Sequence, residues 1–177
     1  MDTLLSENAS RRDFLFVATG AAAAVGAASF VWPLIAQLNP DASTVAGGAP
    51  VEVDLAPIAP GQSIKVFWRG APIFINHRTE QEIAAARAVD WKSLRDPQPD
   101  EARTKPGHEQ WLVVNGICTH LGCIPAYHDG GYGGWLCHCH GSQYDSSGRI
   151  RQGPAPLNLA LVPYEFLSDT KLRIGEA

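Results

Sequence analysis

Residues 118–123 read C-T-H-L-G-C and residues 137–142 read C-H-C-H-G-S, and these two stretches contain all four cysteines of the 177-residue chain. A C-x-H pattern is followed, after sixteen residues, by a C-x-x-H pattern. Each stretch therefore offers one thiolate, one imidazole and a glycine that favours a short loop. Two such loops lying side by side could bind two iron atoms, with the thiolates on one iron and the imidazoles on the other.

The candidate ligands are Cys118, His120, Cys137 and His140. Replacing two thiolates by neutral imidazoles makes an oxidised two-iron cluster less negative, so that it accepts an electron more easily. Centres of this kind have reduction potentials of roughly −150 to +300 mV, against about −400 mV for clusters with four cysteine ligands in plant-type ferredoxins. The second ring nitrogen of each histidine can also couple a proton to the electron.

Two cysteines, Cys123 and Cys139, remain outside this set, one in each loop. They could form a disulfide between the loops, which is expected to persist only outside the cytoplasm. A structural zinc site with cysteine and histidine ligands is the alternative that the spacing leaves open.

The N-terminal part predicts export and membrane attachment. Residues 10–15 read S-R-R-D-F-L, which resembles a twin-arginine export signal, and no charged residue occurs from residue 14 to residue 40. This apolar run is long enough to span a bilayer as a helix, although a buried core helix is the alternative. We expect a cytoplasmic N-terminus over residues 1–13, an uncleaved transmembrane anchor over 14–38 and a flexible hinge over 39–50.

Residues 51–177 predict one β-rich domain with polar turns. A capping box of Thr79 and Glu82 predicts a short helix to about residue 89, and the polar residues 90–107 predict a surface loop. The net charge of −4 and the lack of a basic stripe argue against a nucleic-acid partner. Expected strands cover residues 51–55, 63–68, 71–75, 111–115, 162–167 and 171–174.

The chain resembles the Rieske iron–sulfur subunits of the ubiquinol–cytochrome c reductase (cytochrome bc1) complex in their bacterial form. The resemblance rests on C-T-H-L-G-C and on residues 137–159, C-H-C-H-G-S-Q-Y-D-S-S-G-R-I-R-Q-G-P-A-P-L-N-L, and it extends over nearly the whole chain. It implies a mainly β fold: an antiparallel, β-sandwich-like head with a small cluster-binding subdomain at about residues 111–156, plus one N-terminal transmembrane helix.

The resemblance also implies one Rieske [2Fe–2S] cluster and a role for particular residues. These are the buried-iron ligands Cys118 and Cys137, the exposed-iron ligands His120 and His140, a Cys123–Cys139 disulfide, the hydroxyl donors Ser142 and Tyr144, a Pro-rich covering loop at Gly153 and Pro154, and a docking tip at Leu121. One position departs from the family, because His138 stands where the family usually has proline. We expect His138 to be exposed, and we expect His77, His108 and His128 to be surface residues.

The implied function is electron transfer from quinol to a c-type cytochrome, coupled to proton release, in an enzyme that needs its other subunits. The implied partners are cytochrome b, a c-type cytochrome, quinol at the cytochrome b interface and membrane lipid, in a dimeric complex of the bacterial inner membrane with the head in the periplasm. The alternatives are the Rieske small subunit of a periplasmic molybdenum oxidoreductase such as arsenite oxidase, and a non-redox zinc module.

Overall fold

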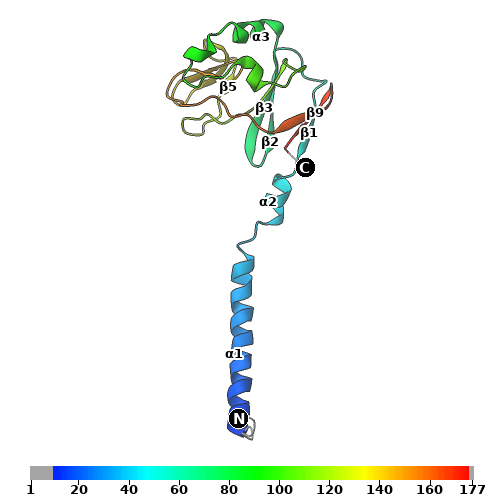
Figure 1. Cartoon of the computed structure of the whole chain (residues 1–177), viewed down its shortest axis with the longest axis vertical. Coiled ribbons are helices and arrows are strands. Elements are labelled where there is room, and N and C mark those ends of the chain that lie inside the picture. Colours follow the sequence, from blue (N-terminus) through cyan, green and yellow to red (C-terminus); the bar gives the residue numbers. More distant parts are fainter. Residues whose placement is uncertain (1–9, 176–177) are drawn as a thin grey trace, which may run out of the picture. The chain divides into compact units, whose positions relative to one another are not determined.

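A computed structural model of the chain describes residues 10–175, and the chain divides into two units, Met1–Val45 and Ala46–Ala177 (Figure 1). Most of the expected cytoplasmic segment, residues 1–9, lies outside the described residues, as do residues 176–177 of the head.

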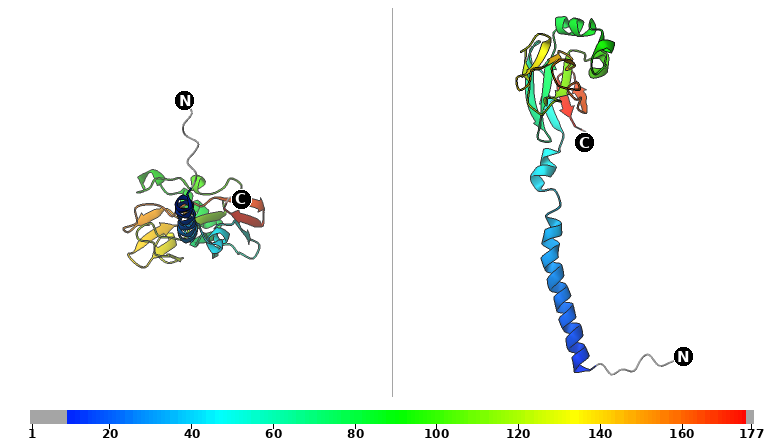
Figure 2. Two further views of the ribbon diagram at one scale, coloured as in Figure 1. Left: turned by 90° about the horizontal axis from the view of Figure 1, so that it is seen from below. Right: turned by 90° about the vertical axis from the view of Figure 1, so that its left-hand side faces the viewer.

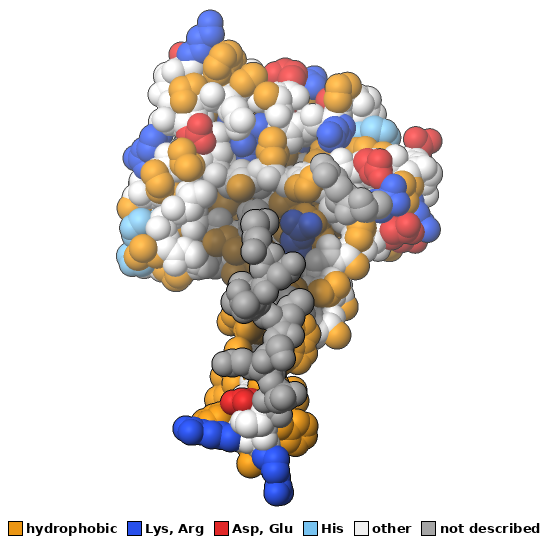
Figure 3. Space-filling model, turned by 60° about the horizontal axis from the view of Figure 1, so that its bottom comes forward, with side chains coloured by type: hydrophobic (Ala, Val, Ile, Leu, Met, Phe, Trp, Pro, Cys, Tyr) orange, Lys and Arg blue, Asp and Glu red, His pale blue; other side chains and the backbone are white. Residues whose placement is uncertain are grey.

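The first unit contains helix α1, Arg11–Ala36. It begins three residues before the predicted start because Ser10 and Asp13 form a capping box, in which the Asp13 N–H donates to Ser10 Oγ at 3.2 Å. At 1.5 Å per residue, 26 residues extend about 39 Å, enough to cross a hydrocarbon core of about 30 Å. None of the residues Arg11–Ala36 is buried, and the helix is apolar enough to cross a membrane. Figure 3 shows hydrophobic side chains along the helix and charged ones at one end.

A short helix, α2 (Ala42–Gly47), occupies the middle of the expected hinge. Asp41 precedes the helix and stabilises its first turn, because its Oδ1 accepts hydrogen bonds from Thr44 N and Ser43 Oγ, both at 2.7 Å. Within the second unit, the Arg69 N–H donates to Gly47 O at 3.0 Å. The segment is therefore locally ordered, and its role as a hinge stays a prediction.

The head consists of three antiparallel sheets, so that the expected mainly β fold with one N-terminal helix is confirmed (Figures 1 and 2). The first sheet has the order β1-β10-β9, the middle sheet β2-β3-β4 and the third sheet β5-β6-β7-β8. Their bounds are β1 Val51–Asp54, β2 Ser63–Trp68, β3 Ala71–His77, β4 Trp111–Asn115, β5 Ala126–Tyr127, β6 Gly133–Cys137, β7 Ser142–Asp145, β8 Ile150–Gln152, β9 Tyr164–Ser168 and β10 Lys171–Ile174.

The middle sheet contributes to two hydrophobic cores. Because successive side chains of a strand point to opposite faces, Ile73 and Ile75 of β3 enter a core with the first sheet, whereas Phe74 enters a core with the third sheet. The second core includes Cys118, Cys137 and the side chains around them. The two candidate metal loops are thus anchored by the packing of Cys118 and Cys137 in this second core.

Local turn and capping signals match the structure. Arg69 and Gly70 have φ values of 52° and 74°, as a tight hairpin turn between β2 and β3 requires. Helix α3 (Glu80–Arg87) starts after Thr79, whose backbone N–H donates to Glu82 Oε2 at 2.7 Å. Figures 1 and 2 place α3 at the end of the head away from the C-terminus.

The prediction of a surface loop over residues 90–107 is wrong for Asp100 and Arg103, which are buried. This segment contains two 3₁₀ helices, η1 (Trp91–Ser93) and η2 (Asp100–Arg103). Asp100 pairs with Arg78 at 2.6 Å, and both side chains are completely buried. Charged side chains of this segment can be buried because they form ion pairs or hydrogen bonds with other buried groups.

Candidate metal centre

The two cysteine–histidine loops connect strands of the second core, and each loop is closed by its own backbone. In the first loop, between β4 and β5, the Cys118 N–H donates to Cys123 O at 2.8 Å and the Gly122 N–H to Cys118 O at 3.0 Å. In the second, between β6 and β7, the Gly141 N–H donates to Cys137 O at 2.9 Å. Both loops are therefore tight turns with defined side-chain directions.

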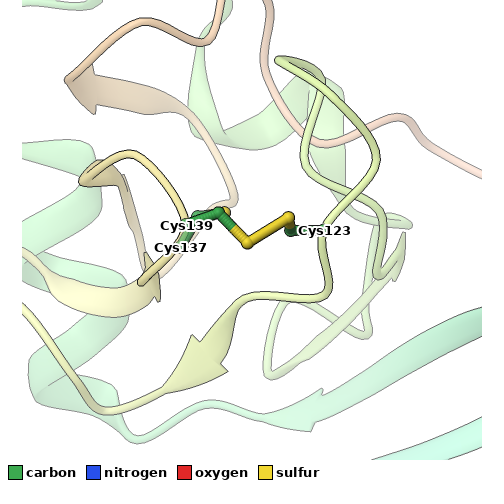
Figure 4. Close-up of side chains that lie close together, drawn as sticks. All are labelled: Cys123, Cys137 and Cys139. Atoms are coloured by element: carbon green, nitrogen blue, oxygen red, sulfur yellow. A yellow bond between two sulfur atoms is a disulfide. The ribbon is translucent and has the colours of Figure 1, made fainter.

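A disulfide between Cys123 and Cys139 joins the two loops, as the resemblance implied (Figure 4). The sulfur atoms of Cys123, Cys137 and Cys139 lie within 4.8 Å of one another. While the disulfide is intact, Cys123 and Cys139 have no thiolate to offer, so this trio is not itself a metal site. Cys118 and Cys137 remain as free thiols.

The two free thiols are buried, and the two imidazoles lie nearer the surface. Cys118 and Cys137 are each 2% exposed, whereas His120 is half-buried and His140 is exposed. The rings of His120 and His140 are edge to face, with centroids 4.6 Å apart. His120 Nδ1 is buried and has no hydrogen-bond partner among residues 10–175. A buried, unpaired ring nitrogen beside a second imidazole, in loops that also carry two buried thiols, fits a donor set for a metal cluster.

Tyr144 lies against Cys118. Its hydroxyl is 3.2 Å from Cys118 Sγ and accepts a hydrogen bond from the Thr119 N–H at 3.3 Å. The Thr119 hydroxyl donates to Leu157 O at 2.6 Å, so the Tyr144 hydrogen has two acceptors within reach, Cys118 Sγ at 3.2 Å and Thr119 Oγ1 at 3.3 Å. Burial, followed by the contact with Cys118, raises the pKa of Tyr144 well above its usual value, so that Tyr144 stays a hydrogen-bond donor.

The two thiols have unequal acidities. Burial alone would raise the pKa of Cys118, but hydrogen bonds, led by that of the Tyr144 hydroxyl, bring it below its usual value. Burial and the neighbouring Cys118 raise the pKa of Cys137. The Cys118 thiol, beside Tyr144, is thus the more acidic of the two.

The Pro-rich loop covers the second cysteine–histidine loop. Gly153 has a φ of 94°, and a Cβ there would lie 2.5 Å from Ser142 Cα and 2.6 Å from Gly141 O, so that only glycine fits. Ser142 is completely buried and its Oγ accepts a hydrogen bond from the Ala155 N–H at 3.1 Å. Pro154 is exposed on the outside of this loop.

The remaining predicted positions lie at the surface around the loops. Leu121 is 70% exposed, as a docking tip would be. His138 is also exposed, but its Nε2 lies 2.8 Å from Asp129 Oδ2, a partner that the sequence did not indicate.

The expectation for the other histidines is correct for His128, which is exposed, and wrong for two others. His77 and His108 are half-buried, because their rings stack on Trp111 and Phe166 with centroids 4.1 and 3.8 Å apart.

Two family models match the chain. The model described as "Ubiquitinol-cytochrome C reductase Fe-S subunit TAT signal" matches residues 1–41, and the model of the Rieske [2Fe-2S] domain matches residues 94–163. The matched ranges include the twin-arginine segment and both cysteine–histidine loops.

Similar proteins cover nearly the whole chain. The ubiquinol-cytochrome c reductase iron-sulfur subunit of Bradyrhizobium diazoefficiens is 71% identical over 96% of this chain and 97% of that protein. The subunit of the same name from Blastochloris viridis is 60% identical over 94% and 93%. A solved structure of a hyperthermophilic respiratory Complex III contains a chain that is 27% identical, with a TM-score of 0.54, over 88% of this chain and 97% of that one.

These relatives favour neither the small subunit of a molybdenum oxidoreductase nor a zinc module. Within the described residues, one helix, α1, is long and apolar enough to cross a membrane. This chain belongs to the family of ubiquinol–cytochrome c reductase iron–sulfur subunits, and its head contains a Rieske [2Fe–2S] domain.

Proposed function

We propose that this chain is the electron-transfer subunit of a quinol–cytochrome c oxidoreductase, and that Cys118, His120, Cys137 and His140 hold its [2Fe–2S] cluster. The observation that supports it best is that two loops joined by a disulfide carry two buried free thiols and two adjacent imidazoles, one of which has a buried ring nitrogen without a partner in residues 10–175. The names of the relatives supply the reaction class.

Different residues of the site have different roles in the proposed reaction. When bound, a cluster with two thiolate and two imidazole ligands supplies a one-electron carrier with a potential of roughly −150 to +300 mV. His120 Nδ1 is buried, which leaves Nε2 as the atom that would take a proton from quinol and release it to water. Cys118 and Cys137 are buried, so the sulfur ligands are shielded from water by the residues packed around them.

The partners follow from the same proposal. Cytochrome b provides the quinol site and a c-type cytochrome accepts the electron, in a dimeric complex of the bacterial inner membrane. Helix α1 anchors the chain in lipid with residues 1–13 in the cytoplasm, and the head lies in the periplasm, where the Cys123–Cys139 disulfide is chemically stable. The exposed Leu121 is the apolar contact at the tip that docks on cytochrome b.

The test is electron paramagnetic resonance of ascorbate-reduced membranes that carry ligand variants. Cys118→Ser, His120→Ala, Cys137→Ser and His140→Ala are each expected to abolish the Rieske signal and quinol oxidation. His138→Ala is the matched control, because this exposed histidine lies between two proposed ligands and outside the set; it should keep the signal. A ligand variant with a normal signal would remove that residue from the set, and zinc in place of iron in the purified chain would overturn the proposal.

A further inference from the structure

The Pro-rich loop is held from outside by an arginine distant in the sequence. Arg95 Nη1 donates to Gly153 O and to Ala155 O, each at 2.6 Å, so that one nitrogen joins the carbonyls on both sides of Pro154. Arg95 belongs to the segment between α3 and β4, 58 and 60 residues away from its two partners. Hydrogen bonds from a charged donor are among the stronger ones in proteins.

The next residue holds the far end of the same loop. Asp96 Oδ2 accepts from the Asn158 N–H at 2.9 Å, and Asp96 O accepts from Asn158 Nδ2 at 3.1 Å. Asn158 is buried, and its Oδ1 accepts from the Ile150 N–H at 2.8 Å. Arg95 therefore holds the Pro-rich loop at Gly153 and Ala155, and Asp96 holds the chain just after the loop at Asn158.

This loop determines where the Ser142 hydroxyl points. A serine hydroxyl has one hydrogen and two acceptor positions. Because Ser142 Oγ accepts from the Ala155 N–H, its hydrogen is directed away from Ala155. Ser142 is the cross-strand partner of Cys137 in the antiparallel ladder of β6 and β7, so its side chain lies next to that of Cys137 on the same face of the sheet. Ala155 thus forms two hydrogen bonds: its N–H donates to Ser142 Oγ, and its carbonyl accepts from Arg95.

We propose that Arg95 is a positioning residue for the cluster: by holding Ala155, it aims the Ser142 hydroxyl at the sulfur atoms and so raises the reduction potential. The proposal rests on the proposed cluster site. Arg95 does not contact the ligand side chains; it acts through the Pro-rich loop. Its positive charge could also favour the reduced state directly, and the experiment separates these two effects.

The experiment is a redox titration of the Rieske signal in membranes that contain the full-length chain in its complex. Arg95→Ala should shift the equilibrium toward the oxidised cluster by up to tenfold, which is about 59 mV for a one-electron couple. The same substitution in a Ser142→Ala background should cause no further shift, because the hydroxyl that Arg95 positions is then missing. Arg95→Lys, which keeps a charge and several N–H donors, should recover part of the shift.

Arg173→Ala is the matched control. Arg173 is a surface arginine that pairs with Glu165 in the first sheet, so its removal should leave the potential unchanged. Equal shifts in the native and Ser142→Ala backgrounds would show a direct charge effect and overturn the proposal. An unchanged potential with an intact cluster would also overturn it, even if the melting temperature fell, and so would loss of the cluster in both Arg95 variants. A wrong cluster assignment would appear separately, as a normal signal in a ligand variant.

Discussion

Tyr144 and Ser142 place two buried hydroxyl groups around the proposed sulfur ligands. Tyr144→Phe and Ser142→Ala should each lower the midpoint potential and leave the cluster in place, since hydrogen bonds to sulfur stabilise the extra negative charge of the reduced state. A hydrogen bond to a charged group contributes about 1.5–3 kcal/mol, and only the difference between redox states counts, so we expect a drop of tens of millivolts to roughly 100 mV. A redox titration measures it. Tyr132→Phe, which alters an exposed tyrosine, is the control; unchanged potentials in the first two variants would mean that these hydroxyls do not donate to sulfur.

At the scale of the elements, the disulfide is the covalent connection between the two cysteine–histidine loops. The Cys123–Cys139 bond spans a sequence separation of 16, for which a disulfide stabilises the fold by about 3 kcal/mol. Unreduced peptides should contain the cross-link in mass spectrometry, and the Cys123→Ser/Cys139→Ser double variant should unfold at a lower denaturant concentration. Alkylatable thiols at both positions in the native protein would contradict the assignment.

The ion pair of Arg78 and Asp100 connects three elements of the head. Asp100 Oδ1 accepts from Arg78 Nη1 at 2.6 Å and from the Ser147 hydroxyl, so that η2 is joined to the end of β3 and to the turn between β7 and β8. Asp100→Ala should lower the free energy of unfolding by about 3–5 kcal/mol, because it leaves the buried Arg78 charge unpaired. Denaturant titration measures the loss. Lys171→Ala breaks the exposed pair with Glu52 and should cost about 0–1 kcal/mol; similar losses in the two variants would contradict the argument.

The same pair predicts a pH dependence. Burial alone would raise the pKa of Asp100, but the hydrogen bond and charge of Arg78 bring it below its usual value. The unfolded chain therefore binds the proton more tightly, and this contribution to stability is complete above the unfolded pKa of about 3.9 and is lost as the pH falls through the folded value. The free energy of unfolding should fall less steeply below about pH 4 in Asp100→Asn than in the native protein. Parallel curves would show that Asp100 does not control this range.

At the scale of the whole molecule, residues 39–50 connect the anchor to the head, which on the proposed function must reach two partners. The last residue of α2 is hydrogen-bonded to the head, because Gly47 O accepts from the Arg69 N–H. Replacing residues 46–48 by three prolines should stiffen the segment and sharply reduce turnover from quinol to cytochrome c. Cluster content and potential should stay unchanged. Three serines at the same positions are the control, and full turnover of the triple-proline variant with an intact cluster would mean that the head does not have to move.

The sequence by itself determined the features that depend on neighbouring residues. The Thr79–Glu82 capping box gave the start of α3, and residues 69–70 gave the hairpin turn. The donor set of the C-x-H and C-x-x-H patterns stays a prediction. The length of the apolar run gave the anchor helix to within three residues at each end. Backbone hydrogen bonds and helix caps follow from residues a few positions apart, so a local pattern is sufficient to predict them.

Only the tertiary structure decided which polar residues are interior and which loops touch. The segment from residue 90 to residue 107 looks like a solvated loop, yet it supplies Asp100 to Arg78 and Arg95 to the Pro-rich loop. These contacts join residues 22 to 60 positions apart, and a charged side chain has the same local pattern whether it faces water or a buried partner. Burial of a charge becomes favourable only when the fold brings its partner to it, which is why the local capping box and hairpin turn could be predicted from the sequence and the contacts of Asp100 and Arg95 could not.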